Sequence, residues 1–133
     1  MEKLVQYKDS QLGLKASALT PRLYRIKFGR DMIVDLNTLK SNYEKVTKRK
    51  VTQNMEINPD NPEELSVLDL TIFENVAFIM ARQYNKAHSL YVPETIEDWL
   101  DNMDEVFTIY EIFPDIMELW HLNQHTTAVP VKK

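Results

Sequence analysis

The segment from Leu65 to Tyr84 is apolar around most of its helical circumference, and this feature limits the possible folds more than any other. Its main stripe at helical spacing is Leu65, Leu68, Ile72, Val76 and Ile79, and the residues that widen the stripe are Phe73, Ala77, Met80 and Tyr84. A single neighbouring element cannot cover so wide an apolar sector, so we expect a central, buried helix surrounded by other elements. The helix-start signal Asn61-Pro62-Glu63-Glu64 precedes this segment, and we expect the helix to run from there to about Lys86.

Two further helices have recognisable starts. Thr20 followed by Pro21 is typical of a helix N-terminus, because threonine caps free amides and proline lacks only an N–H that would be unpaired there. Thr95 with Asp98 three residues later resembles a capping box and predicts a second such start. We expect the first of these helices to continue past Gly29, which would weaken or bend it, because five apolar residues share one helical stripe: Phe28, Met32, Leu36, Leu39 and Tyr43.

The remaining segments are read as a hairpin and a connection. Leu4 and Val5 lead into a polar turn, and Leu12 and Leu14 follow it with alternating spacing, which predicts a β-hairpin within residues 1–19. The basic and polar stretch from Lys45 to Asn54 is expected to form a connection between helices.

These patterns predict a mainly α fold, a compact helical domain of about four to five helices with a short N-terminal β-hairpin. The chain has 133 residues, which is close to the commonest size of one domain. We therefore expect residues 1–133 to form a single domain, with the hairpin at 1–19, a helical body at 20–125 and a flexible tail at 126–133.

The segment from Met103 to Trp120 holds eleven apolar residues in eighteen and most invites a functional interpretation. Pro114 lies inside it and predicts a kink, or two helices that meet at Phe113. One stripe is sufficient to dock this element on the core: Val106, Tyr110, Phe113, Met117 and Trp120. The other large apolar residues either complete the core or form an acid-rimmed groove for an amphipathic helical partner: Phe107, Ile112, Ile116 and Leu119.

The chain lacks the residues on which several classes of enzyme depend. It has no cysteine, and its only glycines are Gly13 and Gly29, so thiol chemistry and phosphate-cradling loops are not expected. Glu118, His121 and His125 would share one helical face and have the spacing of metal ligands, but no further ligand candidate lies near them in the sequence. We therefore expect no catalytic activity, no cofactor and no bound metal.

Charge is distributed unevenly along the chain. Residues 1–50 carry 12 Lys and Arg against 5 Asp and Glu, whereas residues 51–133 carry 4 against 15. The acidic half is expected to repel nucleic acid and to favour basic partners, to pair with the basic half of another copy, or simply to be solvated. No apolar run approaches the roughly 18 residues needed to span a bilayer, so we expect a soluble protein of a reducing cytoplasm, with neither nucleic acid nor a membrane among its partners.

Two stretches of the sequence carry a resemblance to a known family. The first is SALTPRLYRIKFGRDMIVDL, and the second, after the central helix, is VPETIEDWLDNMDEVFTIYEIFPDIMELWHLN. Together with the order of the elements, they resemble the tail assembly chaperones of long-tailed phages and prophages with non-contractile tails. The most similar blocks run from Tyr24 to Asp31 and from Trp99 to Trp120, and the similarity in element order covers nearly the whole chain.

This resemblance implies an assembly factor of the host cytoplasm, absent from the finished virion, that binds the tape measure protein, keeps it soluble and helps recruit tail tube subunits. It also implies self-association and, in many members, a longer frameshifted product, with which the terminal Lys132-Lys133 is compatible. A tape measure chain exposes amphipathic helical surface that aggregates unless it is covered. We hypothesise that the covering surface includes Phe107, Ile112, Phe113, Met117 and Trp120.

Three other functions stay open at this point. A head–tail joining component would share the helical character but remain in the virion, where mass spectrometry of purified particles would detect it. A DNA-binding regulator would use the basic N-terminal half and would bind DNA in a salt-dependent manner. A metal-dependent enzyme would use Glu118, His121 and His125, and metal analysis of the purified protein would reveal it.

Overall fold

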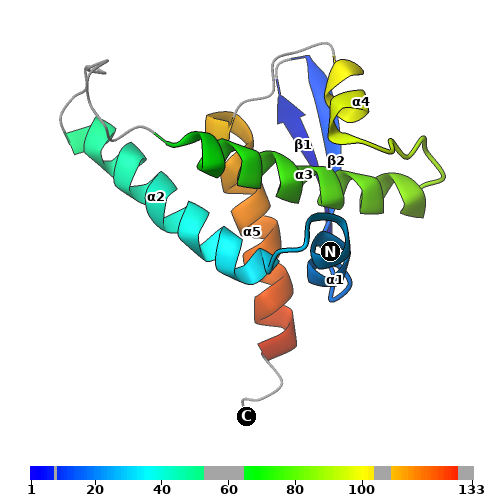
Figure 1. Ribbon diagram of the computed structural model, residues 1–133, viewed down its shortest axis with the longest axis horizontal. Coiled ribbons are helices and arrows are strands. Elements are labelled where there is room, and N and C mark those ends of the chain that lie inside the picture. Colours follow the sequence, from blue (N-terminus) through cyan, green and yellow to red (C-terminus); the bar gives the residue numbers. More distant parts are fainter. Residues whose placement is uncertain (8, 53–64, 104–108, 129–133) are drawn as a thin grey trace.

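The computed structural model describes residues 1–7, 9–52, 65–103 and 109–128. Within these ranges, the elements in chain order are β1 (Glu2–Tyr7), β2 (Ser10–Lys15), α1 (Thr20–Phe28), α2 (Met32–Thr52), α3 (Val67–Ala87), α4 (Ile96–Asp101) and α5 (Ile109–Ala128). The predicted fold class is confirmed: the chain is mainly α and compact, with a short antiparallel hairpin at its N-terminus (Figure 1).

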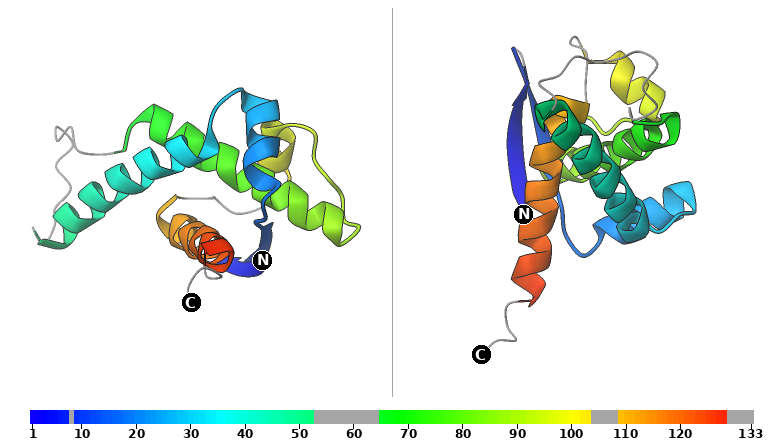
Figure 2. Two further views of the ribbon diagram at one scale, coloured as in Figure 1. Left: turned by 90° about the horizontal axis from the view of Figure 1, so that it is seen from below. Right: turned by 90° about the vertical axis from the view of Figure 1, so that its left-hand side faces the viewer.

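The elements form two layers. Both views in Figure 2 place α5 beside the hairpin in one layer, and α1, α2, α3 and α4 in the other. The two layers enclose a continuous apolar core, to which the hairpin and each of the described helices contribute side chains. Examples are Leu14, Leu36, Phe78 and Ile116. None of the helices in the described ranges combines the length and apolar character needed to cross a membrane.

The hairpin forms as its alternation predicts. β1 and β2 are antiparallel, and Val5 lies opposite Leu12 in the register. Val5, Leu12 and Leu14 are buried, whereas Leu4 is 55% exposed. Because successive side chains of a strand point to opposite faces, Val5, Leu12 and Leu14 share one face of the hairpin, and Leu4 lies on the other face with Gly13.

The central helix is confirmed as α3, but it begins later than predicted. Every residue from Val76 to Ala81 is buried, as the wide apolar sector requires. Leu65 and Ser66 are not helical, and Ser66 caps the helix in a reciprocal box with Asp69, whose backbone N–H donates to Ser66 Oγ at 3.1 Å. The predicted helix start at residues 61–64 lies outside the described residues. It is wrong as the start of α3, because the capping box at Ser66 satisfies free amides of the first turn of that helix.

The single helix expected from Thr20 onwards is two helices, because Gly29 ends α1. Gly29 adopts a left-handed conformation, with a φ of 69°, and its N–H donates to the Arg25 carbonyl at 2.8 Å. Only glycine adopts this conformation without a steric penalty, so the residue expected to bend the helix instead terminates it. The apolar stripe continues across the break because both helices face the same core.

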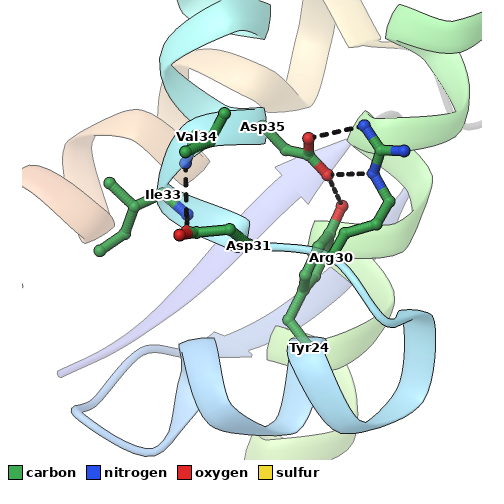
Figure 3. A network of polar contacts seen from close by, with 6 residues as sticks. All are labelled: Tyr24, Arg30, Asp31, Ile33, Val34 and Asp35. Carbon is green, nitrogen blue, oxygen red and sulfur yellow. Dashed lines mark hydrogen bonds and ion pairs between the residues drawn. The ribbon is translucent and has the colours of Figure 1, made fainter.

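Polar contacts fix the corner between α1 and α2 (Figure 3). The buried Tyr24 hydroxyl donates to Asp35 Oδ2 at 2.8 Å, and Arg30 binds the same carboxylate through two N–H groups at 2.7 and 2.9 Å. Asp31 Oδ1 accepts the backbone N–H of Ile33 at 2.9 Å, which caps the first turn of α2. Hydrogen bonds from Arg30, and then from Tyr24, hold the pKa of the Asp35 carboxyl below its ordinary value.

Two segments predicted to be irregular are helical. The basic stretch from Lys45 belongs to α2, which continues to Thr52, so the predicted connection is wrong up to that residue. Lysine and arginine are good helix formers, and Val46 in this part of α2 is buried. At the other end, α5 extends to Ala128 without a break at Pro114, so neither two helices meeting at Phe113 nor a tail beginning at residue 126 is observed. Pro114 lies in the second turn of α5, where loss of one N–H disturbs few helical hydrogen bonds.

Candidate partner-binding surface

A groove with a volume of about 500 Å³ opens between the hairpin, the C-terminal half of α3 and α4. Its rim carries three large apolar side chains that are exposed to solvent: Leu4 at 55%, Leu90 at 53% and Tyr91 at 65%. Its interior includes Leu12, Trp99 and Met103 among other residues, and none of the described residues that line it is charged. Polar side chains of Ser10, Gln11, Asn85 and Asn102 also line it. A concavity with exposed large apolar side chains on its rim is typical of a site that binds a ligand or a partner.

The floor of the groove depends on a close approach between β2 and α3. A Cβ atom at Gly13 would lie 2.3 Å from the ring of Tyr84, so only glycine allows the strand to approach the helix at this point. Tyr84 in turn stacks on His88, with ring centroids 4.2 Å apart, and His88 Nε2 lies 2.9 Å from Glu2 Oε1 on β1. These contacts hold the hairpin and α3 at a fixed separation along the groove.

The connection between α3 and α4 forms the opposite wall, and α3 holds it in place. Arg82 Nε donates to the Pro93 carbonyl at 2.7 Å, and Asn85 Nδ2 donates to the Tyr91 carbonyl at 2.9 Å. The backbone N–H of Leu90 also donates to the Asn85 carbonyl, at 2.8 Å. Leu90 and Tyr91 are therefore exposed on a connection whose backbone is bonded to α3, which reduces the entropy lost when a partner binds.

The connection then leads into α4 through the capping contact that the sequence predicts. Thr95 Oγ1 accepts the backbone N–H of Asp98 at 3.0 Å. The Tyr91 hydroxyl donates to Asp98 Oδ2 at 2.5 Å, and this hydrogen bond raises the pKa of Tyr91 above its ordinary value. This hydrogen bond also ties the Tyr91 side chain to the first turn of α4.

The described residues that line the groove are apolar or polar but uncharged. The hydroxyl groups on its walls belong to Ser10, Tyr84 and Tyr91, and no carboxylate or imidazole lies among the described residues that line it. The described lining could remove apolar side chains of a partner from water without burying a charged lining residue.

The residues hypothesised to cover a client lie mainly in the core. Ile112, Phe113 and Trp120 are at most 6% exposed, and Met117 is half-buried against the core. Phe107 lies outside the described residues. Phe113 packs edge-on against Tyr43, with centroids 5.0 Å apart. The described members of the set therefore pack as the core alternative predicts, and they do not form an exposed surface.

The candidate metal ligands of α5 take part in other contacts. Glu118 Oε1 accepts a hydrogen bond from Lys3 Nζ at 2.6 Å, and Asp115 Oδ1 lies 3.2 Å from the same nitrogen. In the described ranges, no group of three or more His, Asp or Glu side chains has the arrangement of a metal site. The side chain of His125 lies outside the described part. The Lys3 contacts also show that the basic and acidic halves of the chain meet within one molecule.

The sequence contains a signal for the groove, although its residues are far apart along the chain. Leu90, Tyr91 and Val92 are three consecutive apolar residues in a connection between helices, where polar residues are usual. Such a run in an irregular segment indicates either burial or a partner. Leu4 has no comparable signal, because alternation predicts a solvent-facing position for it and nothing in the sequence places β1 beside this connection.

No protein-family model, curated protein or solved structure matches this chain.

Proposed function

We propose that this protein is a non-catalytic assembly factor, a phage tail assembly chaperone of the host cytoplasm that is absent from the finished virion. It binds the tape measure protein, keeps it soluble, helps recruit tail tube subunits and associates with further copies of itself. The observation that carries this proposal is the groove whose described lining residues are uncharged, with Leu4, Leu90 and Tyr91 exposed on its rim. The resemblance of the two sequence stretches supplies the identity of the client.

The shape and chemistry of the groove suit an amphipathic helix. Such a helix presents apolar side chains at intervals of three and four residues, and these can occupy a concave apolar site side by side. Each apolar side chain that leaves water contributes about 1.5–3 kcal/mol to binding before the entropy losses of association. A tape measure protein needs this cover only until the tail tube encloses it, so a reversible contact is sufficient.

The groove replaces α5 as the surface that we assign to the client. Ile112, Phe113 and Trp120 would have to leave the core before they could contact another protein, which would expose much of the apolar interior. Leu4 and Leu90 are already exposed and need no such rearrangement.

Substitution of Leu90 by glutamate is expected to reduce the amount of soluble tape measure protein recovered from co-expression by about tenfold. The new carboxylate would lie on the rim of an apolar site, where a client helix would bury it without a partner. The readout is the fraction of tape measure protein that stays in the supernatant and co-purifies with this chain.

Ile26→Glu provides the matched control, because Ile26 is an aliphatic residue on α1 that is 66% exposed and does not line the groove. Circular dichroism establishes that both variants are folded. Equal recovery with Leu90→Glu and wild type, or an equal loss with Ile26→Glu, would show that the groove does not bind the client.

A further inference from the structure

A second pocket, of about 290 Å³, lies on the other side of the connection that forms the groove wall. Leu90 and Tyr91 line the groove, whereas Val92 lines this pocket together with Leu23 of α1 and with Leu19, which directly precedes α1. The apolar run of the connection is thus divided between two separate concave sites. Leu19 is 48% exposed, so the pocket has an apolar floor that solvent reaches.

The two sites differ in charge. The second pocket is lined by Lys15 at the end of β2 and by Arg82 and Lys86 of α3, and none of the described residues that line it is acidic. Lys86 is exposed and forms no ion pair with a carboxylate in the described part of the chain. A concentration of positive charge around an apolar floor selects for partners of opposite charge.

Nearby groups reduce this positive charge only in part. Glu2 lies opposite Lys15 in the hairpin register, but its carboxylate is 2.9 Å from His88 Nε2, which lowers its pKa. Arg82 donates to the Pro93 carbonyl and lies over the Phe78 ring, and neither group neutralises a guanidinium. Lys15, Arg82 and Lys86 therefore line the pocket, and Glu2 lies beside Lys15 alone among them.

We propose that this pocket is a second docking site, which binds an acidic amphipathic helix of another protein. An aliphatic side chain of that helix packs on Leu19, Leu23 and Val92, and its flanking carboxylates pair with Lys15 and Lys86. A nucleic acid fits less well, because no aromatic side chain on which bases stack is among the described lining residues. The acidic helix α4 of a second copy also fits poorly, since Trp99 on its apolar face is buried in its own core.

The test uses a fluorescent helical peptide of roughly 15 residues, long enough to form a helix, with leucines at intervals of three and four and glutamates beside them. Fluorescence anisotropy at low ionic strength should show that wild type binds this peptide, that added salt weakens the complex, and that the same peptide with lysine in place of glutamate does not bind. Combined Lys15→Glu and Lys86→Glu substitution should weaken binding about tenfold or more.

The matched control reverses two other exposed lysines, through Lys40→Glu and Lys45→Glu on α2, and should change the affinity little. The Leu90→Glu variant should bind the peptide as wild type does, so this result is independent of the client groove. The proposal is overturned if wild type does not bind the glutamate peptide or if both peptides bind equally. It is overturned as well if the control double variant weakens binding as much as the double variant of the pocket, Lys15→Glu with Lys86→Glu. A third contradicting result is that wild type binds only DNA or anionic vesicles. A fourth is that the double variant of the pocket only dissociates copies of this chain from one another.

Discussion

Phe113→Ala is expected to lower the free energy of unfolding by about 3–5 kcal/mol. Phe113 is 1% exposed, and its ring packs edge-on against the rings of Tyr43 and Phe73. Truncation would remove these contacts and leave a cavity at the point where α5 meets α2 and α3. Urea denaturation followed by circular dichroism measures the loss.

Tyr110→Ala is the matched control, since it removes an aromatic ring from the same helix at a position that is 42% exposed. The expected cost is about 1 kcal/mol. A cost for Phe113→Ala as small as that of the control would mean that α5 does not pack on the body in solution. The hypothesis that Phe113 contacts a client would then regain its physical basis.

Asp35→Ala is expected to cost about 2–3 kcal/mol at neutral pH, because it leaves the buried Tyr24 hydroxyl without its acceptor. Tyr24→Phe should cost less, about 1 kcal/mol, since the carboxylate keeps both hydrogen bonds from Arg30. Chemical denaturation of the two variants and wild type compares these costs.

The contribution of Asp35 to the free energy of unfolding is expected to depend on pH, because it requires the ionised carboxylate. The pKa of Asp35 is lowered in the folded protein, chiefly by the Arg30 hydrogen bonds, so the folded state favours the ionised form. The stabilisation is complete above the unfolded pKa of about 3.9 and is lost as the pH falls through the lower folded pKa. The gap in stability between wild type and Asp35→Asn should therefore narrow below about pH 4. A gap that stays constant between neutral and acidic pH would contradict the ion pair, and exposed Asp101→Asn serves as the control.

Local patterns were sufficient to predict the elements whose formation depends on nearby residues. The alternation around Leu12 predicted the hairpin, the wide apolar sector around Val76 predicted a buried α3, and Thr95 predicted the start of α4. Gly29 with Arg25 and Lys27 before it also has the pattern of a helix end, but the apolar stripe from Phe28 to Leu36 favoured continuity. In this case the backbone conformation of a single residue outweighed the periodicity.

The surface that we propose for the client could not be predicted in the same way, because it depends on which residues meet in the folded chain. The apolar residues of α5 satisfy the pattern of a core helix and that of an exposed groove equally well, and only packing against Tyr43 and Phe73 distinguishes the two. Leu4 and Leu90 are far apart in the sequence and line one groove only because β2 approaches α3 at Gly13. The sequence shows a basic first half and an acidic second half, but it did not indicate that Lys3 would form ion pairs with Asp115 and Glu118.

The central claim is that a helical client occupies the groove between the hairpin and the connection after α3. Amide hydrogen exchange of this chain, alone and with a soluble segment of the tape measure protein, tests it most directly. We expect binding to slow exchange in β1 and in the connection at residues 88–93, with little change in α2. Slowed exchange confined to α5, or no change in any segment at a saturating concentration of the client, would contradict the claim.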